Sequence, residues 1–160
     1  YFRWLWQPKR SFMIILNIPL FKGLTLEQIE DMKNKHCMTE KKYKKNSFIF
    51  RAGDIVHEIG IVLEGSINIE MIDMWDNKSI LSNIDVGQIF AESYALCNEP
   101  MMVDAVATKD STILMLNMRQ IFGAFHKKEF NIINKNILHF VKKCSWTSFD
   151  LPDKPVHKTQ

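Results

Sequence analysis

Histidine and glutamate are the side chains in this sequence that could hold a catalytic metal. A metal centre built on a β-roll needs an inward-facing His-x-His pair, a glutamate and a further histidine. His57 and Glu64 are available, but residue 59 is isoleucine and no histidine lies between His57 and His126. The ligand count therefore fails, and no metal site is predicted. The remaining histidines are expected to be single surface or helix residues: His36, His126, His139 and His157.

The cysteines are the next candidates for chemistry. The three of them, Cys37, Cys97 and Cys144, lie far apart and form neither a metal-spaced pair nor a disulfide framework. We expect a reduced, cytoplasmic setting, with Cys97 as a small buried residue of a short helix rather than a redox sensor. No Ser-His-Asp arrangement, paired-carboxylate motif or Walker loop is visible, so the sequence predicts no enzymatic activity and no cofactor.

Charge and hydropathy indicate little about partners. The net charge is only +3, but six basic residues fall within one segment: Lys33, Lys35, Lys41, Lys42, Lys44 and Lys45. They could form a nucleic-acid patch, although we favour lysines that coat a helix end and protect an edge strand. The apolar run at 11–21 is too short to span a bilayer and contains Pro19, so no membrane association is expected.

Short β-rich runs separated by turn residues dominate the middle of the chain. Gly53 and Asp54 in the turn at 51–54, and Gly65 in the turn at 64–66, supply the geometry that tight turns need. Residues 67–72 alternate apolar and polar side chains, as in a strand with one buried face. Strands are predicted at 38–43, 48–50, 59–63, 67–74, 79–84, 102–107 and 111–117. Such closely spaced strands predict an antiparallel roll or barrel.

Helices are expected on both sides of this roll. Thr25 is a good N-cap and Gln28 completes a capping box, so a helix should run from there to about residue 35. The chain becomes helical again from Met118 onward. Apolar residues there repeat at alternating spacings of three and four, as in a heptad seam: Phe130, Ile133, Ile137, Phe140 and Cys144. Such a helix could lie on the roll or pair with a second copy.

Two motifs in the roll resemble the cyclic-nucleotide-binding domain of the Crp/Fnr transcription regulators. Residues 50–54 read F-x-x-G-D, and residues 62–69 follow the strand pattern around Gly65. The stretch from Pro19 to Ile29 is similar to the first helix of the same family. The resemblance covers residues 19–144. It implies a mainly β fold, a double-stranded β-helix or jelly roll, with an N-terminal helix and a C-terminal helix that pairs with its twin in a homodimer.

The resemblance also implies a ligand site between Gly87 and Ala107. In the family this segment reads G-x-x-F-G-E, then a short helix, then an arginine. Backbone N–H groups at the helix start face the phosphate, the glutamate accepts a hydrogen bond from the ribose, and the arginine neutralises the cyclic phosphate. Gly87, Phe90 and Glu92 fit this pattern.

Two departures weaken the expected nucleotide site. Ala91 replaces the glycine before Glu92, and the arginine position falls on Met101 or Met102, depending on where a one-residue gap is placed. No arginine lies between Arg51 and Arg119, and Lys109 is expected in a hairpin turn that points elsewhere. The lost charge-assisted bond should cost about 1.5–3 kcal/mol, or about ten- to a hundred-fold in affinity. The predicted ligand-binding residues are Ala91, Glu92, Ser93, Met101, Met102 and Val103.

Together these features predict an effector-binding and dimerisation domain. We expect residues 1–18 to be a leader of uncertain origin, 19–144 the sensor domain with its C-terminal helix, and 145–160 a loose tail. The resemblance implies a cytoplasmic bacterial regulator with weak or no cyclic AMP binding. An unidentified, less polar effector or an empty pocket would replace the nucleotide. No winged helix-turn-helix is visible after Cys144, so direct DNA binding is not expected. The alternatives are a ligand-free interaction module and, with less support, a cupin-type metal enzyme on the same architecture.

Overall fold

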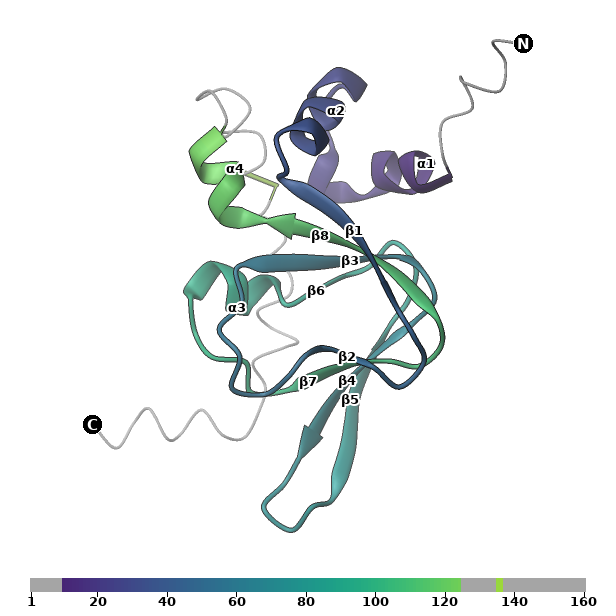
Figure 1. Cartoon of the computed structure of the whole chain (residues 1–160), viewed down its shortest axis with the longest axis vertical. Helices are drawn as coiled ribbons and strands as arrows, with labels where there is room; N and C mark the ends of the chain where they lie inside the picture. The colour runs from purple at the N-terminus through teal and green to yellow at the C-terminus, as the bar shows by residue number, and fades with distance from the viewer. Residues whose placement is uncertain (1–9, 125–134, 137–160) are drawn as a thin grey trace.

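Two four-stranded antiparallel sheets face each other in the computed structural model, which describes residues 10–124 and 135–136 (Figure 1). The first sheet has the order β1 (Met38–Tyr43), β8 (Ser111–Asn117), β3 (Glu58–Glu64), β6 (Ile89–Phe90). The second has the order β2 (Phe48–Phe50), β7 (Asp104–Ala107), β4 (Ile67–Ile72), β5 (Lys78–Ile84). The predicted mainly β roll is therefore confirmed.

Short helices cover the outer side of the first sheet. α1 (Arg10–Asn17), the 3₁₀ turn η1 (Pro19–Phe21), α2 (Leu26–Asn34) and α4 (Met118–Ala124) lie there, and α3 (Glu92–Cys97) closes one side of the roll (Figure 1). The predicted capping box begins α2: the Thr25 N–H donates to Gln28 Oε1 at 2.9 Å, and the Gln28 N–H donates to Thr25 Oγ1 at 3.2 Å. These two bonds satisfy backbone donors that the first helical turn cannot pair internally.

Strands β3 and β8 are buried on both faces, which explains their nearly continuous apolar sequences. One face packs against the helices in a cluster that we call the outer core. Its members include Leu20, Phe21, Ile59, Ile61, Ala95, Leu116, Met118 and Ile121. The other face meets the second sheet in what we call the inner core. Its buried residues are Phe50, Val56, Val62, Ile67, Phe90, Met101, Val103, Ala105, Ala107, Ile113 and Met115.

The sequence pattern did not indicate helix α1. Residues 1–18 were expected to be a leader of uncertain origin, yet Arg10–Asn17 is helical, and Ile15 and Ile18 are buried in the outer core. Apolar packing on the roll therefore starts before the residue 19 boundary that the sequence suggested. The predicted heptad seam at 130–144, the tail at 145–160 and residues 1–9 of the leader lie outside the described residues.

The lysine-rich segment follows the edge of the first sheet. β1 is an outer strand of that sheet, and Lys41 and Lys42 on it are exposed. Lys41 also forms an ion pair with Glu58 at 3.4 Å. The lysines therefore lie on an edge strand and at the end of α2, where they were expected. None of the described helices is long and apolar enough to cross a membrane.

Candidate ligand-binding site

The site segment begins where β6 turns into α3 at Ala91. Ala91 has φ 65° and ψ 9°, which is the left-handed region. An L-residue in this conformation costs about 1–2 kcal/mol, whereas glycine adopts it freely. The backbone geometry therefore gives a physical reason for the glycine that the family pattern places here. Ala91 packs beside the inner core, as does Tyr94 one turn later.

The segment that follows α3 is held against the turn at residues 51–54. The Gly53 N–H donates to the Met101 carbonyl at 2.7 Å, and the Met101 N–H donates to the Asp54 carbonyl at 2.8 Å. Ile55 and Pro100 add an isolated β-bridge beside them. These bonds fix the backbone conformation of Met101, and that conformation directs its side chain.

Met101 and Met102 face opposite ways. Met101 is 3% exposed and belongs to the inner core together with Val103. Met102 is 50% exposed, and its backbone N–H donates to the Tyr94 hydroxyl. Met101 is therefore the position from which a side chain enters the interior, and it is the better counterpart of the family arginine. Of the six predicted residues, Ala91, Met101 and Val103 meet at the inner core, whereas the Met102 side chain points to solvent.

Glu92 and Ser93 form the first residues of α3. Ser93 is buried and Glu92 is half-buried. Burial raises the pKa of Glu92, and a hydrogen bond from its own backbone N–H partly opposes that rise. No positive charge from the described part of the chain contributes to this shift. The carboxylate therefore sits in a partly desolvated position without the arginine that accompanies it in the family pattern.

Replacing Glu92 with glutamine should stabilise the protein at about pH 7 and above. Because its pKa is raised from 4.5, the folded state holds the proton more tightly than the unfolded state. Stability is therefore lost as pH rises from the unfolded pKa through the folded one, and it stays lost at higher pH. Urea unfolding across this pH range should show a gain for Glu92→Gln that vanishes in acid. Glu99→Gln at an exposed neighbour is the control, and an equal gain there would contradict this account.

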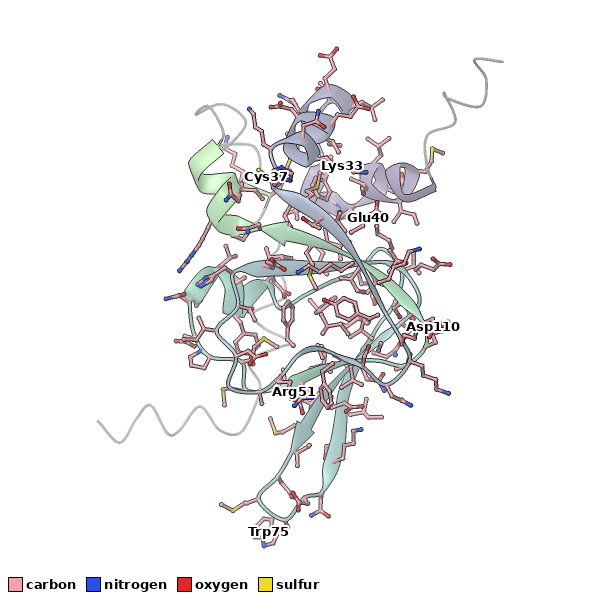
Figure 2. All side chains as sticks on the ribbon, viewed as in Figure 1. Lys33, Cys37, Glu40, Arg51, Trp75 and Asp110 are labelled. Carbon is pink, nitrogen blue, oxygen red and sulfur yellow. The ribbon has the colours of Figure 1, made fainter. Side chains whose placement is uncertain are left out.

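Arg51, the arginine that precedes the site in the sequence, lies outside the roll. The Arg51 guanidinium carbon is 4.3 Å from the centroid of the Phe48 ring. Phe48 pairs with Val106, which alternates with the inner-core residues Ala105 and Ala107 and so faces outward. Arg51, labelled beside the second sheet in Figure 2, is therefore committed to the outer face. Lys109 is exposed in the β7–β8 turn, as predicted.

Tyr94 is a site residue that sequence reasoning missed. It is half-buried beside the inner core, and its hydroxyl accepts the hydrogen bond from Met102 described above. Burial raises the pKa of Tyr94, and the nearby charges of Glu99 and Glu92 add to the rise. An aromatic residue in the short helix was the only available signal, because the contact depends on the path of the following loop. Two carboxylates and a phenol thus lie near the residues predicted to hold an anion.

Two further expectations concern metal and redox chemistry. Within residues 10–124 and 135–136, no three His, Cys, Asp or Glu side chains are grouped so that they could hold a metal ion. Cys97 was expected to be a buried residue of the short helix, but it is exposed at the C-terminal end of α3. That expectation was wrong because the last turn of this six-residue helix extends beyond the core that covers Ala95.

Comparisons with known proteins agree with this architecture. The sequence pattern of the cyclic nucleotide-binding domain matches residues 40–128. No curated protein matches the chain. Among solved structures, a cyclic nucleotide-binding domain from Methylobacillus flagellatus has a TM-score of 0.73 at 17% identity, covering 88% of this chain and 79% of its own. The Thermus thermophilus catabolite activator protein has a TM-score of 0.67 at 20% identity, covering 78% of this chain.

Two regulatory subunits of a cAMP-independent protein kinase A, from two trypanosome species, are also similar. The Trypanosoma cruzi protein, bound to guanosine, has a TM-score of 0.64 at 19% identity over 94% of this chain. A triple mutant of the Trypanosoma brucei protein, bound to cAMP, has a TM-score of 0.64 at 21% identity over 94% of this chain. This chain spans 57% of the activator protein and 50% and 51% of the two regulatory subunits.

At these identities the structural likeness establishes the fold. The family pattern extends from β1 through β8, the strands that build both sheets, and into α4. It covers more than half of the 160 residues. The protein therefore belongs to the cyclic nucleotide-binding domain family.

Proposed function

We propose that this chain is the ligand-sensing domain of a Crp/Fnr-type regulator, and that its roll accepts an uncharged ligand in preference to cyclic AMP. The observation that carries the proposal is the buried side chain of Met101 at the position of the family arginine. A thioether there can contact an apolar group, but it cannot neutralise a phosphate. A sensing role, rather than catalysis, is what this family and its regulator neighbours support.

Electrostatics argues against a cyclic phosphate at this position. A buried anion without a partner loses its hydration and recovers little in return. Here the carboxylates of Glu92 and Glu99 act on Tyr94, which lies beside the inner core, while Arg51 stacks on the outer face. The T. brucei triple mutant bound to cAMP fits this account, since one of its three substitutions replaces threonine with arginine.

A ligand in the roll could act on the C-terminal helices through the outer core. Ala95 of α3 belongs to the same buried cluster as Met118 and Ile121 of α4. Movement of α3 would therefore displace side chains that pack against α4, in which Gly123 offers a hinge. We further propose that the heptad-like segment beyond α4 pairs with the same segment of a second copy. Ligand binding in the roll would then affect the dimer.

Calorimetric titration with cyclic AMP and guanosine tests the ligand class. Guanosine is chosen because it carries no phosphate and is bound in the similar T. cruzi protein. We expect cyclic AMP to bind with a dissociation constant of about 0.1 mM or weaker, and guanosine to bind more tightly. Cyclic AMP binding at about 1 μM or below would overturn the proposal.

A ligand-free interaction module is the second candidate. The observation that favours it is the packing between the sheets, where the Phe50 and Phe90 rings lie 6.0 Å apart at an angle of 56°. Side chains of the inner core thus occupy part of the space that a ligand would need. If neither probe binds and the C-terminal segment still dimerises, as measured by analytical ultracentrifugation, this candidate replaces the first.

A further inference from the structure

The Phe90 ring rests on Gly60, a glycine inside strand β3. Gly60 pairs with Phe90 of β6 on one side and with Met115 of β8 on the other. Directly opposite residues of neighbouring strands share a face, so all three residues lie on the face that meets the second sheet. A Cβ built on Gly60 would collide with the far end of the ring, lying 2.5 Å from Phe90 Cε1 and 2.7 Å from Cε2. Only glycine at residue 60 therefore leaves room for the ring in this position.

The same ring reaches toward the second sheet. Phe90 is 3% exposed, and its ring centroid lies 6.0 Å from that of Phe50 on β2. Met101, the buried residue at the position of the family arginine, belongs to the same inner core. Side chains from both sheets and from the candidate site thus surround the Phe90 ring, which takes up space between the sheets.

Phe90 is also the residue directly before the helix of the candidate site. The next residue, Ala91, is the N-cap of α3. A ligand that enters the roll beside α3 must therefore fit next to the ring or displace it from Gly60. We propose that Phe90 is a specificity-determining residue, which limits the size of the ligand that the roll accepts. The role of Phe90 rests on the proposed function, in which a ligand enters the roll at this place.

Removing the ring tests this role, with guanosine and indole as probes in calorimetric titration. Phe90→Ala leaves a space lined by apolar side chains, which stays dry and can hold a small apolar molecule. We expect both probes to bind this variant at least about ten-fold more tightly than the parent chain, because they no longer compete with the ring. Phe21→Ala is the matched control. It removes an equally buried phenyl group from the outer core, on the other face of the first sheet, and should leave the affinity for guanosine unchanged.

Two results would overturn the size limit. One is unchanged affinity for both probes in folded Phe90→Ala, and the other is an equal gain for guanosine in Phe21→Ala. A parent chain that binds no guanosine would instead count against the proposed function, and the indole titration would still decide whether Phe90 restricts the space between the sheets. If Phe90→Ala does not fold, Phe90→Leu keeps an apolar side chain there and should give a smaller gain, so that no gain in the folded leucine variant overturns the proposal.

Discussion

Replacing Met101 with arginine, in a chain that also carries Ala91→Gly, is expected to raise the affinity for cyclic AMP by about ten- to a hundred-fold. Met101 points into the inner core, so a guanidinium there could reach a phosphate at the start of α3. Glycine at residue 91 suits the left-handed backbone, where φ is 65°, and removes a methyl group beside the phosphate. Calorimetric titration of the double variant against the parent measures the gain.

The same substitution should lower stability when no ligand is present. Met101 is almost fully buried, and an unpaired guanidinium in its place would lose hydration without a counter-charge. Cyclic AMP should then recover much of that loss, because a ligand that binds only the folded state stabilises it. A large thermal shift with nucleotide is therefore expected for the variant, together with a small one for the parent.

Met102→Arg provides the matched control. It adds the same charge one residue away, but from a side chain that is half exposed and outside the inner core. It should leave cyclic AMP affinity nearly unchanged at moderate salt, since exposed charges are screened. Tighter binding by Met102→Arg than by Met101→Arg would show that the family arginine corresponds to Met102 instead. No gain from either variant would mean that the missing cation is not what weakens the site.

The roll was predictable because its signals are local. Gly53 and Gly65 mark turns by their backbone freedom, and both have positive φ in the structure. The period-two pattern at 67–72 predicted strand β4, although Glu70, beside a shift in strand register, is buried against that pattern. Thr25 with Gln28 marks a helix start. Each of these signals depends on residues close together in the chain, so no knowledge of the tertiary fold was needed to interpret them.

The site was harder to predict because it depends on contacts between distant segments. Whether Met101 or Met102 faces inward depends on two backbone bonds to Gly53 and Asp54, almost fifty residues away. The role of Tyr94 likewise depends on where the loop after α3 passes. Helix α1 was missed because it has only eight residues and lacks strong sequence signals at its ends, and its apolar side packs against the first sheet.

Replacing Gly65 with alanine is expected to lower the free energy of unfolding by about 2–5 kcal/mol, which urea unfolding would measure. Gly65 carries the chain from β3 in the first sheet to β4 in the second, with φ of 92°. A Cβ at this position would lie 2.7 Å from the Ser111 Cα, which is backbone and cannot turn aside. Displacing Ser111 would also disturb its hydroxyl, which accepts from the Ser66 N–H at 3.2 Å and donates to the Lys109 carbonyl at 2.7 Å.

Gly53→Ala separates the backbone strain from the collision. Gly53 has φ of 94°, and a Cβ there would meet no atom within 4 Å. Both variants carry the left-handed strain of about 1–2 kcal/mol and the same unfolded-state entropy change, so these contributions cancel in the difference. The remaining difference, about 1–3 kcal/mol, measures the collision with Ser111. Equal losses in the free energy of unfolding would show that the turn between β3 and β4 can relax. Close approach of Ser111 would then not be what requires glycine at residue 65.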